Sequence, residues 1–285
     1  MSSHTALGDR MKHYEAAESD RRLLPGVPTL ARMDGRAFHR FTRGMLRPYD
    51  DRFVDCMVTT ARQLAKATNA CIGYTASDEI TLVWHEPDPH SQIWFDGRVA
   101  KMTSGLAALA TLYFNQAVAD HFYKDEGYAA RNPVFDARVW VVPNRREACN
   151  ALLWREQDAT RNSLSAACQC HYSHRELLGK GSAEQHELLH AAGINWHDYP
   201  YWFKRGTYVR KVTCERGFTL RELDKLPERH EARRNPDLKI WRSDWQTVEL
   251  PPISTIVNAE AVVFENADPV VASTEPEDKC RHQNG

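Results

Sequence analysis

The sequence predicts an α+β fold, in which a mixed or antiparallel β-sheet carries flanking helices. One pair of predicted strands is joined by a tight hairpin and others are joined by helices, which is typical of this class. Neither GxGxxG nor GxxxxGKS/T occurs in the 285 residues, so a doubly wound nucleotide-binding fold is disfavoured. With 42% apolar and 26% charged residues, the chain has the composition of a globular protein with a real core. If phosphates are bound, metals and arginines must hold them.

The first predicted strands end at sharp turns. Residues 27–33 are predicted to form a short strand that stops at the turn signal Asp34-Gly35. Residues 70–75 and 80–84 are rich in strand-forming residues and lie close together, so they are predicted to form a β-hairpin. Its tip lies at or beside Ser77-Asp78-Glu79.

A helix is predicted to begin at Asp50-Asp51, since aspartate caps the first turn of helices. Apolar residues then recur at helical spacing between Phe53 and Ala65. The same patterns predict helices over 98–122, 144–175 and 183–192, and strands over 135–142 and 206–214.

Composition also excludes several classes of protein. No apolar run approaches the roughly 18 residues that a membrane span needs. The N-terminal MSSHTALGDRMKHYE has no apolar segment of the kind found in signal peptides. The seven cysteines are odd in number and show no CxxC spacing, so we expect reduced thiols. We therefore expect a cytoplasmic protein with no membrane partner.

Positive charge is concentrated in one segment although the whole chain is nearly neutral. The formal net charge is -1, yet residues 21–47 hold seven arginines, no lysine and a single acid, Asp34. Arginine presents a planar fork that binds phosphate or carboxylate through two hydrogen bonds. The segment is thus a candidate phosphate-binding surface, and a solvated basic face is the alternative.

Two carboxylates could share divalent cations. Asp34 follows the first strand and Asp78 lies at the hairpin tip, so pairing of these strands would bring them side by side. Mg²⁺ takes one or two such carboxylates together with phosphate oxygens and keeps several waters. Two ions about 3.5 to 4 Å apart would suit an in-line phosphoryl displacement. Glu79 should point to the opposite face unless the turn rotates it. The alternative is that these acids bond only their own turns.

Six blocks of the sequence stand out as possible family signatures. They are RMDGRAFHRF at 32–41, RPYD at 47–50, GYTASDE at 73–79, FDAR at 135–138, WREQDATRNS at 154–163 and FKRGTY at 203–208. These blocks resemble signatures of the tRNA(His) guanylyltransferase-like family, the 3′-to-5′ RNA polymerases, and the paired DGR and SDE blocks are the most specific. The resemblance runs from about residue 10 to residue 215.

The resemblance implies a palm similar to that of polymerases and nucleotidyl cyclases, and nucleotide addition to the 5′ end of tRNA. ATP activates the 5′-phosphate, and the 3′-hydroxyl of GTP or another nucleotide then attacks it. The implied catalytic residues are Asp34, Asp78 and Glu79, with two Mg²⁺ held by Asp34, the Gly35 carbonyl and Asp78. The implied nucleotide-binding residues are Arg36, Ala37, Phe38, His39, Arg47, Asp50, Ser77, Arg98 and Lys101, and the RNA-binding residues are Arg155, Arg161 and Asn162.

The resemblance also implies an organisation. Residues 1–143 form a palm-like catalytic core and 144–267 an extension that completes the fold and the RNA site. Composition, not the resemblance, predicts a disordered tail over 268–285, since this segment lacks large apolar residues. Family members are often tetramers, so we expect a homo-oligomer. Thr160-Arg161-Asn162-Ser163 replaces the His-Ile-Asn-Asn block of eukaryotic members, and Ala76 replaces their Gln. The chain is similar to the bacterial and archaeal-type branch, which is associated with template-dependent repair of 5′-truncated tRNA, and this argues against a strict role in tRNA(His) guanylylation.

Two other functions are weighed against this one. The run HELLH at 186–190 is a literal HExxH, which makes a zinc peptidase an alternative. Trp196 stands where the third metzincin ligand is expected and no methionine follows Met102, so an ordinary amphipathic helix is favoured. A non-catalytic RNA-binding module is the second alternative. Cys168, Cys170, His171 and His174 lack ligand pairs on separate elements, and we expect no metal there.

Overall fold

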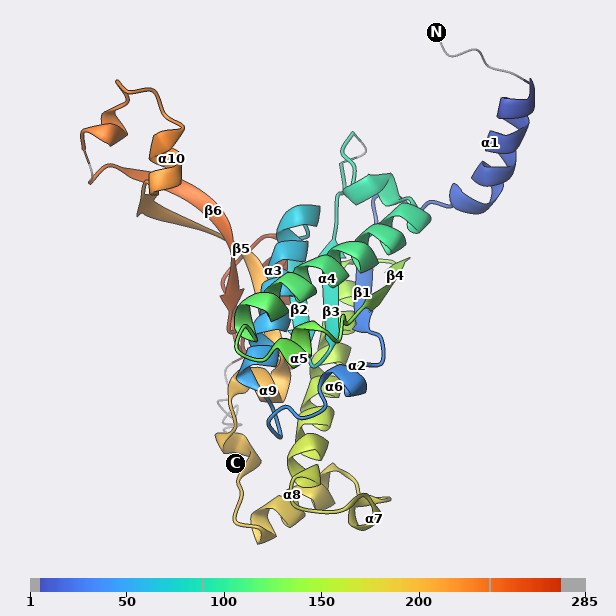
Figure 1. Ribbon diagram of the computed structural model, residues 1–285, viewed down its shortest axis with the longest axis vertical. Helices are drawn as coiled ribbons and strands as arrows, with labels where there is room; N and C mark the ends of the chain where they lie inside the picture. The colour runs from blue at the N-terminus through green and yellow to red at the C-terminus, as the bar shows by residue number, and fades with distance from the viewer. Residues whose placement is uncertain (1–5, 89, 236, 273–285) are drawn as a thin grey trace, which may run out of the picture.

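The computed structural model describes residues 6–88, 90–235 and 237–272, and in them one antiparallel sheet carries helices on both faces (Figure 1). The strand order is β4-β1-β3-β2-β5-β6. Every neighbouring pair runs antiparallel, which confirms the α+β class. The strands are β1 Thr29–Gly35, β2 Ile72–Ala76, β3 Glu79–Trp84, β4 Phe135–Val141, β5 Thr207–Gly217 and β6 Lys239–Val248.

The helices form a layer on each side of the sheet. On one face, α3 and α4 enclose a core that includes Met33 and Phe114, and on the other α6 and α11 enclose Leu30 and Leu152. The described helices are α1 Ala6–Ser19, α2 Phe38–Phe41, α3 Asp51–Thr68, α4 Val99–His121, α5 Glu126–Ala129, α6 Arg145–Gln169, α7 His174–Leu177, α8 Ser182–Ala191, α9 Tyr201–Arg205, α10 Leu220–Asp224 and α11 Ala259–Phe264, with 3₁₀ turns η1 Trp94–Gly97, η2 Trp196–Asp198, η3 Glu231–Arg233 and η4 Ile253–Thr255.

Strand β1 shows how the sheet divides its side chains between the two layers. Ala31 and Met33 are buried on the α3 and α4 side, whereas Leu30 is buried on the α6 side. Because successive side chains of a strand alternate, Asp34 lies on the α6 side with Leu30. The end of β1 thus presents an acid on the face that α6 crosses.

Helix α3 begins where the sequence predicts. Asp50 is its N-cap and accepts a hydrogen bond from the Arg52 amide at 3.1 Å. The predicted apolar stripe of α3 is buried between Cys56 and Ala65, where the helix packs against β2 and β5. The helix ends at Asn69, whose left-handed conformation is one that asparagine adopts more readily than most residues.

Strand β6 is absent from the sequence-based prediction. It pairs with β5 along ten residues and forms a ribbon that projects from the body, with α10 near its far end (Figure 1). Most of its side chains are exposed, so no apolar alternation marks it in the sequence.

The helix expected over 144–175 is interrupted, because α6 ends at Gln169 and a capping box at Ser173 starts α7.

Part of the predicted tail is bonded to the body. The Val270 amide donates to Oδ1 of Asn258 at 2.8 Å, and the Ala272 amide donates to the Thr255 carbonyl at 3.0 Å. The expectation of a free tail from residue 268 is therefore wrong for 268–272, because backbone pairing needs no large apolar side chain. Residues 273–285 lie outside the described residues. Among the described helices, none has the length and apolar content to cross a membrane.

Candidate active site

Asp34 and Asp78 meet at one end of the sheet. Asp34 is in register with Glu79 across the β1–β3 pair, and the Gly35 amide donates to the Asp78 carbonyl at 3.0 Å. Burial raises the pKa of Asp78, and the nearby charge of Asp34 raises it further. The two acids thus converge as the sequence analysis expects.

Glu79 lies with these acids and not on the opposite face. Asp78 belongs to the hairpin turn, so strand alternation does not begin until Glu79, which shares the Asp34 side of the sheet. Burial raises the pKa of Glu79, and the positive charge of Arg155 partly offsets this. Arg155 pairs with Glu79 at 3.4 Å and also with Asp158, and the arginine is only 8% exposed.

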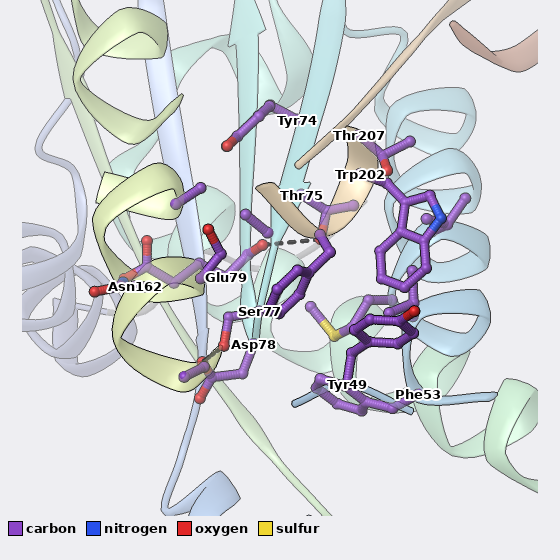
Figure 2. A pocket seen from close by; sticks show the side chains of 18 of the residues that line it. Tyr49, Phe53, Tyr74, Thr75, Ser77, Asp78, Glu79, Asn162, Trp202 and Thr207 are labelled. Carbon is purple, nitrogen blue, oxygen red and sulfur yellow. Dashed lines mark hydrogen bonds between the residues drawn. The ribbon is translucent and has the colours of Figure 1, made fainter. Parts of the chain in front are cut away.

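A pocket of about 220 Å³ opens beside the hairpin tip. Figure 2 shows Ser77, Asp78 and Glu79 with Asn162 on one side, and Tyr49 and Trp202 on the other. The Tyr49 ring lies 4.8 Å from the Trp202 ring and 5.0 Å from the Phe203 ring, centroid to centroid. The pocket therefore joins an aromatic wall to an acidic one.

The aromatic wall is what sequence reasoning missed. Trp202 and Phe203 belong to α9, which is remote in sequence from the hairpin, and Tyr49 precedes α3. Only the family block at 203–208 pointed to this segment, and it gave these side chains no role. The Tyr74 hydroxyl donates to the Arg205 carbonyl at 2.7 Å and holds α9 beside β2.

Comparison with known proteins decides the family. Residues 8–143 match the family model described as Thg1, tRNAHis guanylyltransferase. A bacterial tRNA(His) guanylyltransferase (Thg1)-like protein solved with ATP is 30% identical, has a TM-score of 0.74, and the match covers 91% of this chain and 99% of that one. This chain belongs to the tRNA(His) guanylyltransferase (Thg1) family. It is a nucleotidyltransferase.

Two further relatives agree with this family. A bacterial Thg1-like protein solved with GTP is 28% identical with a TM-score of 0.68, and the match covers 88% of this chain and 94% of that one. The tRNA(His) guanylyltransferase of Neurospora crassa is 28% identical over 213 residues, which are 70% of each chain. The Thg1 resemblance of the signature blocks is thereby confirmed.

The DGR block of this Thg1-family chain leads directly from β1 into α2. The Arg36 amide donates to the Val134 carbonyl at 2.9 Å, and Ala37 has a left-handed φ of 54°. Phe38 is buried in the core, whereas the side chains of Arg36 and His39 are exposed. Any contact of Phe38 with a nucleotide would therefore use its backbone.

Asp50 lines the pocket, but its carboxylate is already engaged. It accepts hydrogen bonds from the Leu46 amide at 3.2 Å and from the Arg52 guanidinium at 2.7 and 3.0 Å. The hydrogen bond from Arg52 lowers the pKa of Asp50 despite its burial. Asp50 thus shapes the pocket wall and caps α3. Arg47, three residues earlier, is exposed and does not line the pocket.

Arg98 and Lys101 are not brought to the site within one chain. The Val99 amide donates to the Arg21 carbonyl, upstream of β1, whereas Phe114 of the same helix contacts Phe38 at the Gly35 end. Val99 and Phe114 are separated by roughly 20 Å along the axis of α4. These two predicted nucleotide-binding residues therefore lie toward the other end of the sheet.

The predicted RNA-binding residues lie on α6. Arg155 is buried under its ion pairs, Arg161 is exposed and pairs with Asp158, and Asn162 lines the pocket. A contact between Arg155 and RNA would require it to leave Glu79 and Asp158.

The HExxH run makes up half of the ten-residue helix α8. Leu189 is buried, His190 is exposed, and the His186 ring packs 5.4 Å from the Trp196 ring. Cys168 is buried and Cys170 exposed. Within the part of the chain that the structure describes, no group of three or more His, Cys, Asp and Glu side chains is placed to hold a metal ion.

Proposed function

We propose that this Thg1-family chain adds nucleotides to the 5′ end of tRNA. The observation that carries the proposal is the convergence of Asp34 and Asp78 beside an aromatic-walled pocket. The tRNA substrate and the use of ATP and GTP are suggested by the names of the relatives. Residues 160–163 differ from the His-Ile-Asn-Asn block of eukaryotic family members, and this difference favours repair of 5′-truncated tRNA over strict guanylylation of tRNA(His).

The acids fit a divalent cation. Asp78 is desolvated next to a second carboxylate, so a cation would relieve the repulsion that raises its pKa. Two carboxylates are enough for Mg²⁺, because phosphate oxygens and waters complete its shell. We propose that Asp34, Asp78 and the Gly35 carbonyl hold two ions. When bound, they would neutralise charge on the phosphates that react.

The chemistry needs two phosphoryl transfers, and the residues of this chain position both. An oxygen of the RNA 5′-phosphate attacks the α-phosphorus of ATP and releases pyrophosphate. The 3′-hydroxyl of the incoming nucleotide then attacks the activated 5′-phosphate and releases AMP. Such steps depend mainly on positioning and charge neutralisation. We propose that Tyr49 and Trp202 hold a nucleobase, that Ser77 and the amides after Gly35 hold triphosphate, and that Glu79 orients Arg155.

The location of the protein, its oligomeric state and its RNA-binding residues belong to the same proposal. We propose a cytoplasmic enzyme, a homotetramer, in which Arg161 and Asn162 bind RNA. In a homo-oligomer, Arg98 and Lys101 are free to serve a neighbouring subunit's site, since they lie away from their own.

Incubation of 5′-truncated tRNA with each labelled nucleoside triphosphate, ATP and Mg²⁺ tests the proposal. The wild-type protein should label the RNA, and mapping should place the new nucleotide at the 5′ end. Asp34→Ala and Asp78→Ala should each abolish labelling, because each removes a carboxylate from the metal site.

Asp224→Ala is the matched control, since Asp224 is an exposed acid on α10. It should label like the wild type, and circular dichroism should show that all variants fold. Extension at the 3′ end, or near-wild-type labelling by both site variants, would overturn the proposal.

A further inference from the structure

Trp154 is an exposed aromatic residue in a buried stretch of α6. The tryptophan is 50% exposed, whereas its neighbours Arg155 and Glu156 are 8% and 2% exposed. The Arg155 guanidinium carbon lies 4.2 Å from the centroid of the indole ring. Because Arg155 is held by Glu79 and Asp158, it supports the indole from the protein side and leaves the ring partly open to solvent.

The Trp154 indole is connected to the candidate metal site through the side chain of Arg155. A single guanidinium, that of Arg155, contacts both the indole and the Glu79 carboxylate. Glu79 is in turn in register with Asp34. Only the Arg155 and Glu79 side chains therefore lie between a group bound on the indole and the acids.

The turn of α6 places Trp154 on the solvent face of the helix, directed away from β5. Glu156 accepts a hydrogen bond from the Tyr208 hydroxyl of β5, and Arg155 pairs with Glu79 of β3. Each residue rotates an α-helix by about 100°, so stepping back from Glu156 through Arg155 to Trp154 turns away from β5. The aromatic wall of Tyr49 and Trp202 lines the pocket beside Asp78 and Glu79, whereas Trp154 does not line that pocket.

We infer that Trp154 stacks on the 5′-terminal base of the RNA. This inference rests on the proposed function, which puts the 5′-phosphate at Asp34 and Asp78. The terminal base is joined to that phosphate by one ribose, so it lies within reach of the indole. An aromatic face accepts any base, as an enzyme that extends RNAs with different 5′ ends requires. Exposed Arg161 follows on the same helix face and adds positive charge for the backbone.

A fluorescent base tests the inference directly. 5′-truncated tRNA carrying 2-aminopurine as its 5′-terminal base is titrated with protein, since stacking on an aromatic ring quenches this fluorophore. Wild-type protein should quench it. Trp154→Leu should lose the quenching and raise the Kd for RNA about tenfold, and Trp154→Phe should restore much of both. The KM for ATP should not change.

Tyr123→Leu is the matched control, because Tyr123 is 68% exposed, lies beside the Lys124 amine and follows α4, on the face of the sheet opposite α6. It should behave as wild type. Unchanged quenching in Trp154→Leu, or a change confined to the KM for ATP, would overturn the inference. Quenching needs no chemistry, so wild-type protein that quenches through Trp154 yet incorporates no nucleotide would refute the proposed function alone.

Discussion

Gly35 is packed so closely against Phe38 that no side chain fits at its position. A Cβ there would lie 2.4 Å from the Phe38 ring. That ring is itself wedged against Phe114 and Phe135, with centroids 5.3 and 4.9 Å away. The glycine of the DGR block is therefore required by core packing, and its position fixes the end of β1 beside Asp34.

Gly35→Ala should destabilise the protein. The added methyl group would push Phe38 out of the aromatic cluster, and overpacking of this kind costs about 2 kcal/mol. Urea unfolding should show the loss in the free energy of unfolding. Labelling of tRNA should fall as well, because the Gly35 carbonyl and Asp34 shift with the strand.

Gly217→Ala is the control for this substitution. A Cβ at Gly217, the last residue of β5, would meet nothing within 4 Å. Its unfolding free energy should stay close to that of the wild type. Equal stability of the two variants would contradict the packing argument at Gly35.

Helix α6 is held in place at its first turn, at the end of the sheet opposite the acids. Nε of Arg145 donates to Nδ1 of His85 at 3.0 Å, and its Nη1 pairs with Glu265 at 2.8 Å. The bond to Arg145 requires a neutral His85. Burial lowers the pKa of His85, and the charge of Arg145 lowers it further.

Stability should therefore depend on the protonation of His85. Its pKa is depressed in the folded state, so the unfolded chain binds the proton more tightly. The stabilisation is present above pH 6.5, the ordinary pKa, and is lost as the pH falls through the depressed value. Urea unfolding at pH 7.5 and 5.5 should show a smaller free energy of unfolding at the lower pH.

His85→Gln should reduce this pH dependence, since glutamine cannot be protonated in this range. His174→Gln is the control, because His174 is exposed on α7. An identical pH dependence in His85→Gln and the wild type would rule out His85 as its source.

The acids and the pocket belong to segments that only the complete fold joins: β1, the β2–β3 hairpin, the start of α3, α6 and α9. A ligand that binds this assembly binds the native state and not the unfolded chain. ATP with Mg²⁺ at 100 times its Kd should therefore raise the free energy of unfolding by about 2.7 kcal/mol.

Asp78→Asn should lose most of this stabilisation, because it removes a carboxylate that is proposed to hold the metal. Asp224→Asn, in an exposed acid of α10, should keep it. Unfolding curves with ATP and EDTA should resemble those without ligand. If ATP with Mg²⁺ raised the free energy of unfolding of Asp78→Asn as much as that of the wild type, nucleotide binding would not depend on the acids.

Local patterns were enough to predict much of the fold and the meeting of the two acids proposed to bind metal. The cap at Asp50, the apolar stripe of α3 and the hairpin around Asp78 are signalled by residues close together in sequence. The convergence of Asp34 and Asp78 also followed, because a strand end and a hairpin tip meet when their strands pair. Such signals act over a few residues, and tertiary contacts confirm them without changing them.

Other features depended on residues that are distant in sequence. The exposed strand β6 has no apolar alternation, and residues 268–272 are held through backbone hydrogen bonds. The burial of Arg155 and the distance of Lys101 from the acids follow from how α6 and α4 lie on the sheet. Side-chain surroundings of this kind arise from long-range packing and not from spacing along the chain, so the aromatic wall and the stacking surface of Trp154 emerged only from the folded molecule.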